Sequence, residues 1–130
     1  MTFSDMVAAR TVWQEARGEG FQGMKAVAHV IRNRVADGRW GSTPAAVCLW
    51  PMQFSGWRPS DPNYAPACSL SDSDPVLAQC MEAWVASESE PDPTDNACFY
   101  YASSLATPPV WAGKMIETTQ IGAHIFYRDK

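Results

Sequence analysis

The segment VWQEARGEGFQGMKAVAHVIRNRV, which runs from Val12 to Val35, decides the fold of this 130-residue chain. It predicts the end of one helix, a break rich in glycine, and a second helix from about Gln22 to Ala36 that Gly38 ends. This second helix is amphipathic, because its apolar residues recur at helical spacing: Met24, Val27, Ala28, Ile31 and Val35.

Glu15 stands at the turn between these two helices. A carboxyl group there can be enclosed by apolar side chains, and burial disfavours the charged form, so its pKa should rise. A carboxylic acid that stays protonated near neutral pH is what the cleavage of a glycosidic bond requires. By itself, the position also fits an ordinary solvated glutamate near a helix end.

The rest of the chain predicts further helices followed by a small β element, hence an α+β fold in a single domain over residues 1–130. The expected helices are one that Thr2 or Ser4 caps and that ends near Ala16, one from Thr43-Pro44 through Cys48, and one from Asp74-Pro75 to about Ser87 or Glu88. Residues 51–67 are expected to form a loop, and residues 97–102 and 122–127 are expected to form strands.

Composition excludes several classes of protein. Apolar residues make up 46% of the chain, which predicts a globular fold, and no apolar run approaches the ~18 residues of a membrane helix. The net charge of −4 argues against nucleic acid as the main partner. The first 60 residues carry seven basic against four acidic side chains, which suits an anionic wall polymer, although surface charge also varies without function. No secretory signal peptide is visible.

Several motifs of the chain, taken in order, resemble the catalytic domain of cell-wall hydrolases related to spore cortex-lytic enzymes (SleB-type). The likeness extends from about Met6 to Tyr127 and rests on the order and spacing of its pieces rather than on any one of them. The pieces are EARGE (15–19), Gly23, AVAHVIRNRV (26–35), PMQFS (51–55), DPT (92–94), ACFYY (97–101), Trp111 and IGAHIFY (121–127).

This resemblance implies a lysozyme-like fold, mainly helical with a small antiparallel β element, and an enzyme that cuts the MurNAc–GlcNAc strand of peptidoglycan. It also implies that Glu15 is the catalytic acid. No second acid has a matching motif, whereas glycosidases that use water or a covalent intermediate normally need two carboxylates. One acid is enough if the C6 hydroxyl of muramic acid attacks its own anomeric carbon, which is the lytic transglycosylase reaction.

Alternatives to this reading remain open. Hydrolysis with water as nucleophile is the nearest, followed by an N-acetylmuramoyl-L-alanine amidase and by a peptidoglycan-binding module without activity. Two histidines without ligand spacing do not predict a zinc site, and we expect neither metal nor cofactor. We expect a monomer of the endolysin or wall-remodelling kind that acts on the wall in the periplasm and is held in the cytoplasm until lysis.

Candidate residues for substrate binding come from the later motifs: Gln53, Phe54, Ser55, Tyr100, Tyr101 and Trp111. Turn chemistry or core packing explains each of them as well. Tyr100 and Tyr101 alternate across a strand, so one should face a cleft, and we favour Tyr100. Supporting roles are expected for Glu19, which can pair with Arg17 or organise the turn, and for His124, for which a structural hydrogen bond is the plainer explanation.

For several other residues we expect a structural role. His29 should be a satisfied core histidine, and the triplet 32–34 should close the second helix by bonding loop carbonyls. Cys80 and Cys98 are expected to be buried free thiols. Cys48 and Cys68 flank a loop and can form a bridge if the protein works outside the cytosol.

Overall fold

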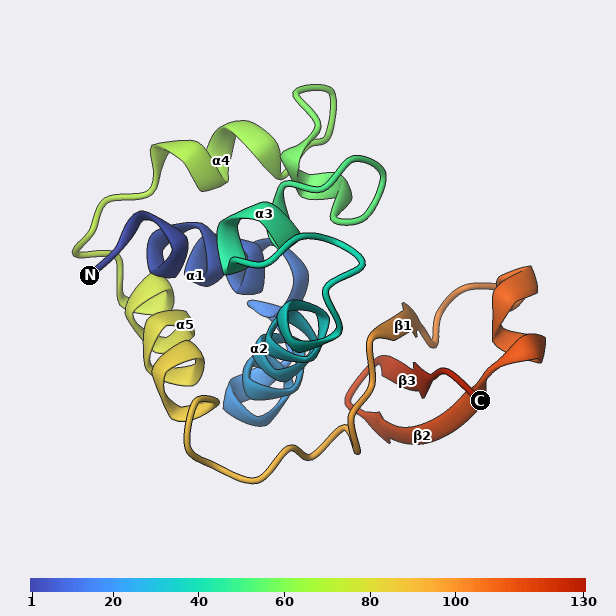
Figure 1. Cartoon of the computed structure of the whole chain (residues 1–130). Coiled ribbons are helices and arrows are strands. Elements are labelled where there is room, and N and C mark those ends of the chain that lie inside the picture. The colour runs from blue at the N-terminus through green and yellow to red at the C-terminus, as the bar shows by residue number, and fades with distance from the viewer.

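The computed structural model describes all 130 residues and separates the helices from a three-stranded sheet (Figure 1). The α-helices are α1 (Phe3–Ala16), α2 (Gly20–Asp37), α3 (Pro44–Cys48), α4 (Tyr64–Ser69) and α5 (Pro75–Ala86). Two short 3-10 helices are η1 (Ser55–Trp57) and η2 (Val110–Lys114), and the strands are β1 (Phe99–Ala102), β2 (Ile116–Ile121) and β3 (His124–Arg128). The expected α+β class, mainly helical with a small antiparallel sheet, is confirmed.

Helix α1 lies at the centre of the helical part, in contact with α2, α3, α4 and α5. Thr2 caps it, because its side chain accepts a hydrogen bond from the backbone N–H of Asp5 while the Asp5 carboxylate accepts one from the N–H of Thr2. Its small apolar residues let the other helices approach closely, and Ala8, Ala9 and Val12 are fully buried. This packing fixes the position of Glu15 in its last turn.

Helix α2 is buried on two sides, between the other helices and the sheet. Its predicted apolar stripe packs into the main core, and only Val35 of that stripe is partly exposed. A second face, carrying Ala26 and Val30, packs against Phe126 of β3. The helix begins at Gly20, two residues earlier than expected, and ends at Gly38, whose φ of 90° is the left-handed conformation that glycine adopts readily.

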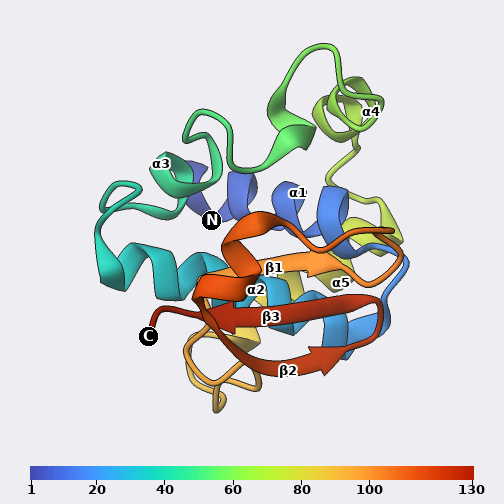
Figure 2. The ribbon, with the colours of Figure 1, turned by 90° about the vertical axis from the view of Figure 1, so that its right-hand side faces the viewer.

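The sheet is antiparallel with the order β1-β3-β2 (Figure 2). Two of its strands were expected, and each begins two residues later than predicted. Strand β2 was not expected, because its sequence IETTQI shows no run of alternating apolar residues, and the strand is largely exposed or half-buried. Pairing places Tyr100 opposite Phe126, so the core contacts of Phe126 also position Tyr100.

One expectation for the middle of the chain is wrong, and one bridge that was considered possible is not formed. Residues 51–67 are not only a loop, since they contain η1 and the first part of α4, which Arg10 fastens by donating to the carbonyls of Ala67 and Leu70. Cys48 and Cys68 do not form a bridge, since the first is buried and the second is exposed, and all four cysteines are free. Cys80 and Cys98 are buried thiols as predicted. No helix has the length and apolar character needed to cross a membrane.

Candidate active site

The structure brings Glu15 of α1 into contact with Tyr100 of β1, although 85 residues separate them in the sequence. The Tyr100 hydroxyl donates a hydrogen bond to Oε1 of Glu15, and the carboxylate is half-buried. Tyr100 is held by strand pairing and by packing against Phe126. The centroids of the two rings lie 5.5 Å apart. The carboxyl group therefore sits at the junction of the helical part and the sheet.

The environment of Glu15 favours its protonated form. Burial is the largest influence and raises the pKa of this carboxyl group, and the negative charge of Asp61 adds to the rise. The hydrogen bond from Tyr100 and the positive charge of Arg34 lower the pKa by smaller amounts. The net direction is upward, which confirms the expected rise. Burial beside Glu15 also raises the pKa of Tyr100 well above its usual value, so that hydroxyl remains a donor.

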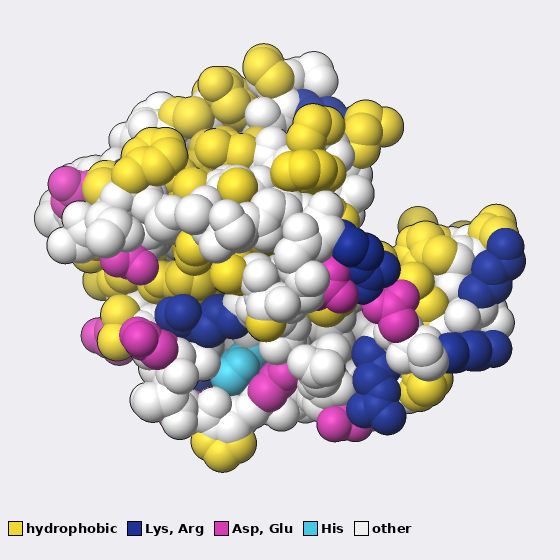
Figure 3. Space-filling model, in the orientation of Figure 1, with side chains coloured by type: hydrophobic (Ala, Val, Ile, Leu, Met, Phe, Trp, Pro, Cys, Tyr) yellow, Lys and Arg dark blue, Asp and Glu magenta, His cyan; other side chains and the backbone are white.

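A cavity of about 400 Å³ opens beside this pair, between the segment that follows α3 and the strand β1 with η2. Figure 3 shows the surface hollowed between the helical part and the lobe that the sheet forms. We call this cavity the cleft. Its lining residues are Arg34, Met52, Gln53, Phe99, Tyr100, Trp111 and Met115.

Three of the candidate substrate-binding residues line the cleft: Gln53, Tyr100 and Trp111. Gln53 is fixed because its Oε1 accepts a hydrogen bond of 3.2 Å from Nη1 of Arg34. The ring of Trp111 is held by Phe99 and Tyr127, at centroid distances of 5.6 Å and 5.4 Å. An amide, a phenol and an indole thus face one cavity from different elements, a combination suited to a sugar, whose hydroxyl and acetamido groups need hydrogen bonds and whose faces stack on aromatic rings.

The other three candidates do not line the cleft. Phe54 is buried, and its ring lies 5.0 Å from the guanidinium of Arg34. Ser55 is exposed at the start of η1. Tyr101 points to the opposite face of the sheet from Tyr100 and stacks on Tyr127 at 5.7 Å. The structure therefore places Tyr100, rather than Tyr101, at the cleft.

Glu19 does not pair with Arg17, which was one of the two roles considered for it. Glu19 accepts a hydrogen bond of 2.7 Å from the backbone N–H of Ala123, and so fastens the turn between β2 and β3 to the start of α2. Gly122 is required in this turn, because its φ is 57° and a Cβ would lie 2.5 Å from Oε1 of Glu19. Arg17 instead donates to Asn63 at 2.7 Å and lies over the ring of Trp13.

Replacing Glu19 tests this fastening role. Glu19→Ala should lower the free energy of unfolding by about 1 kcal/mol, because the N–H of Ala123 loses its acceptor in a half-buried turn. The melting temperature, followed by circular dichroism, should fall by roughly 4 °C. Glu19→Gln keeps an acceptor oxygen and should melt close to the wild type. Equal losses in the two variants would mean that charge, rather than the hydrogen bond, is what the turn needs.

His124 supports Tyr100 by packing rather than by the expected hydrogen bond. The two rings lie 4.8 Å apart, and Nδ1 of His124 is enclosed without a partner. Burial is the main cause that lowers the pKa of this imidazole, so the ring is neutral at pH 7. His29 also differs from expectation, because its Nε2 is enclosed without a hydrogen bond.

Arg34, Met52, Phe99 and Met115 line the cleft but were not predicted to belong to it. The triplet 32–34 does bond loop carbonyls as expected, those of Ala97 and Cys98, and Arg32 also donates to the carbonyl of Trp84 in α5. These bonds fasten α2 to distant segments rather than close its own end. A signal for Arg34 existed in the sequence, because it lies three and seven residues after Ile31 and Val27 and so falls on the buried face of α2. No group of three or more His, Cys, Asp or Glu side chains forms a possible metal site.

Comparison with known proteins agrees with this geometry. The model of the Cell Wall Hydrolase family matches residues 18–127. The chain is 29% identical to the spore cortex-lytic enzyme of Bacillus subtilis and 30% identical to that of Bacillus cereus, in each case over 119 residues. Those matches cover 91% of this chain but only 35% and 41% of the relatives, so the chain spans about two fifths or less of their length.

Solved structures resemble the chain along nearly all of its length. The catalytic domain of the germination-specific lytic transglycosylase SleB from Bacillus anthracis superimposes with a TM-score of 0.78 at 26% identity, over 98% of this chain and 97% of that one. The catalytic domain of the SleB protein of Bacillus cereus gives the same TM-score at 28% identity, over 98% and 91%. The likeness therefore includes both the helices and the sheet.

Proposed function

This chain belongs to the Cell Wall Hydrolase family, and we propose that it cleaves the glycan strand of peptidoglycan as a lytic transglycosylase with Glu15 as its catalytic acid. The observation that carries the proposal is the half-buried carboxyl group whose pKa burial raises and whose oxygen accepts a hydrogen bond from Tyr100 beside an open cleft. The likeness to a catalytic domain described as a lytic transglycosylase supports the same reaction.

In the proposed reaction, protonated Glu15 gives its proton to the oxygen that joins C1 of MurNAc to the next GlcNAc. The C1–O bond breaks, and the GlcNAc leaves with a free hydroxyl. The Glu15 carboxylate then accepts the proton of the C6 hydroxyl of MurNAc while that oxygen bonds to C1, which closes a 1,6-anhydro ring. Glu15 ends the cycle protonated, so the step needs no outside reagent. Tyr100 can stabilise charge on the carboxylate between the two transfers.

The sequence offers no second acid with a matching family motif, which supports this reaction over hydrolysis. Inverting glycosidases place a second carboxylate roughly 6.5–9.5 Å from the acid to activate water, and retaining enzymes use one as the nucleophile. An internal hydroxyl removes the need for either. The lining set supplies hydrogen bonds and stacking instead, and we propose that Gln53 and Trp111 bind the sugars.

Analysis of the products tests the proposal. Purified sacculi digested with the wild-type protein should yield fragments that end in 1,6-anhydro-MurNAc, which are lighter by one water than hydrolysis products in mass spectrometry. Reducing MurNAc ends alone would assign hydrolysis with water as nucleophile. Release of free stem peptides from intact glycan would assign the amidase reaction. Binding to sacculi without any released fragment would leave only a binding module.

We also propose that residues 1–130 work as one catalytic domain, because a solved catalytic domain matches 98% of the chain, and that the protein acts as a monomer. The proposed substrate lies outside the cytoplasmic membrane, so we place the action on the wall, in the periplasm. That the protein is of the endolysin kind, held in the cytoplasm until lysis, stays a prediction.

A further inference from the structure

We propose that Arg34 recognises an anion in the cleft, and that this anion is the free lactyl carboxylate of muramic acid in glycan whose stem peptide has been removed. The inference rests on the proposed function and names the form of peptidoglycan that the cleft prefers. It starts from a positive charge that the fold buries without pairing it.

Arg34 is the one Lys, Arg, Asp or Glu side chain that is buried in this protein, with 6% of its surface exposed. Three aromatic rings surround its guanidinium, those of Trp40, Phe54 and Phe99, at 4.6, 5.0 and 5.7 Å. No carboxylate lies within salt-bridge distance of it. Burial of an unpaired charge is costly, so a protein that keeps one at a cleft has a reason other than stability.

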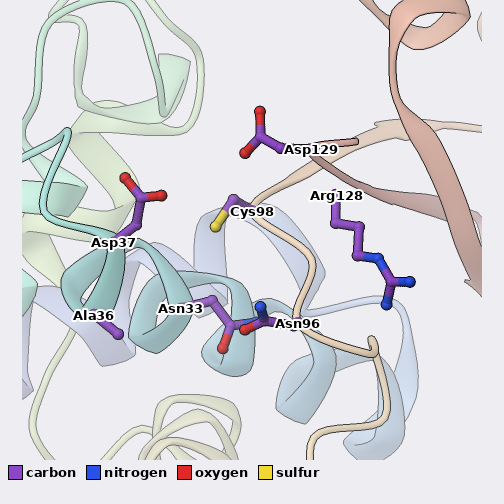
Figure 4. A pocket seen from close by; sticks show the side chains of 7 residues that line it. All are labelled: Asn33, Ala36, Asp37, Asn96, Cys98, Arg128 and Asp129. Carbon is purple, nitrogen blue, oxygen red and sulfur yellow. The ribbon is translucent and has the colours of Figure 1, made fainter.

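Arginines elsewhere in the molecule contrast with Arg34. A polar cavity of about 270 Å³ at the end of α2 is rimmed by Asp37, Arg128 and Asp129 (Figure 4). Its charges are neutralised within the protein, because Arg39 bridges Asp37 and Asp129, and Arg128 pairs with Asp95. That cavity therefore offers no free cation to a ligand, whereas the cleft does.

One nitrogen of Arg34 remains free to bind a ligand. Nε donates to the carbonyl of Cys98 at 2.8 Å, and Nη1 donates to Oε1 of Gln53 at 3.2 Å. These two bonds fix the plane of the guanidinium and leave Nη2 without an acceptor in the protein. Nη2 is not enclosed either, because the only enclosed side-chain atoms without a partner belong to Gln14, His29 and His124. Because Arg34 lines the cleft, we place this exposed nitrogen at the cleft.

The chemistry of the proposed substrate identifies the anion. The sugars of the glycan are neutral except at the lactyl ether on C3 of muramic acid, which is an amide when it carries a stem peptide and a carboxylate when it does not. Other carboxylates of peptidoglycan lie farther out on the flexible peptide. Arg34 lines the cleft next to Tyr100, whose hydroxyl contacts Glu15, so we place the group that Arg34 binds on a sugar near the scissile bond. A buried arginine binds a carboxylate through strong, charge-assisted hydrogen bonds.

This preference would place the enzyme after a reaction that removes stem peptides from the glycan. The supplying reaction is hydrolysis of the amide between the lactyl group and the first residue of the peptide, which leaves the carboxylate that Arg34 binds. Peptide-bearing glycan, in which that group is an amide, should be the poorer substrate.

The test compares three glycans that differ at the lactyl group. One is peptide-free glycan with its carboxylate, the second is the same glycan converted to the carboxamide with carbodiimide and ammonia, and the third bears its peptides. We expect the wild-type KM to be about tenfold to a hundredfold lower for the carboxylate than for the carboxamide, the size typical of a hydrogen bond to a charged group. The peptide-bearing glycan should resemble the carboxamide.

Variants then assign the preference to Arg34. Arg34→Gln should cleave the carboxylate and carboxamide glycans with nearly equal KM, and Arg34→Lys should retain a reduced preference because it keeps the charge but not the planar fork. Arg32→Gln is the matched control on the same helix. Arg32 lies over Trp84 at 3.7 Å and donates to the Ser87 hydroxyl, away from the cleft, so its variant should keep the full preference.

Each outcome decides the matter. Equal wild-type KM values for carboxylate and carboxamide, or an undiminished preference in Arg34→Gln, would overturn the proposal for Arg34. Cleavage of these glycans would still support the proposed cleavage of peptidoglycan. No cleavage of any glycan would overturn both. If Arg34→Gln does not fold, as shown by the loss of its cooperative melting transition, the wild-type comparison and Arg34→Lys test the proposal instead. An Arg34→Lys variant that prefers the carboxylate as strongly as the wild type would show that the planar guanidinium is not needed.

Discussion

Glu15→Gln should abolish the clearing of cell walls, with a fall in kcat on the order of a thousandfold, because the amide cannot give a proton to the glycosidic oxygen. The substitution conserves shape, and the amide oxygen can still accept the hydrogen bond from Tyr100. The measurement is the initial rate of turbidity loss of purified sacculi, alongside the melting temperature. Glu82→Gln, on the exposed side of α5, makes the same chemical change away from the cleft and should leave the rate unchanged.

The same variant should be as stable as the wild type or more stable at pH 7. Burial raises the folded-state pKa of Glu15 above its unfolded value, so the folded state holds this proton more tightly. The group therefore favours folding fully below its unfolded pKa, and that contribution is lost as the pH rises through the raised value. The amide that replaces the carboxyl group carries no charge at any pH and should escape this loss. An active and less stable Glu15→Gln protein would show that the carboxyl group is structural.

The helical part could be predicted from the sequence because its signals are local. The periodicity of the segment 12–35, the cap at Thr2 and the proline starts at Pro44 and Pro75 each depend on residues within a few positions of one another. The same segment also placed Glu15 at the end of α1, where burial raises the pKa of its carboxyl group as expected.

Strand β2 and α4 could not be predicted in the same way. Strand β2 is stabilised by pairing with β3 rather than by an apolar face, so its residues carry no period-two pattern. Helix α4 is six residues long, and its last residues are held by Arg10, more than fifty positions away in the sequence. Contacts of this kind between distant residues leave no mark on the local sequence.

The cleft could be predicted only in part, because contacts between distant residues decide which side chains face it. Alternation in a strand separates Tyr100 from Tyr101, but only the pairing with β3 decides which of them faces Glu15. Arg34 was assigned to the end of its helix, since the three aromatic rings that enclose its guanidinium come from three separate segments. Its position on the apolar face of α2 was the signal that distinguished it from the exposed arginines.

Tyr100→Phe should lower kcat on the order of a hundredfold while leaving the fold intact. The ring still packs against His124 and Phe126, so the sheet keeps its contacts, and only the hydroxyl that donates to Glu15 is lost. Without that donor the carboxylate is less stabilised between the two proton transfers. Tyr101→Phe, one residue along the strand on the opposite face, removes the same atom and should retain nearly the wild-type rate.

The pH profile separates a role for this hydroxyl in the reaction from a role in packing. The hydrogen bond from Tyr100 lowers the pKa of Glu15 against the larger upward effect of burial, so its removal should raise that pKa further. Because the reaction needs the protonated acid, activity falls as the pH rises through this pKa, and in Tyr100→Phe the fall should move to higher pH. A lower rate with an unshifted profile would assign Tyr100 to the wall of the cleft alone. A shift to lower pH would contradict the geometry, since loss of a donor to the carboxylate can only make ionisation harder.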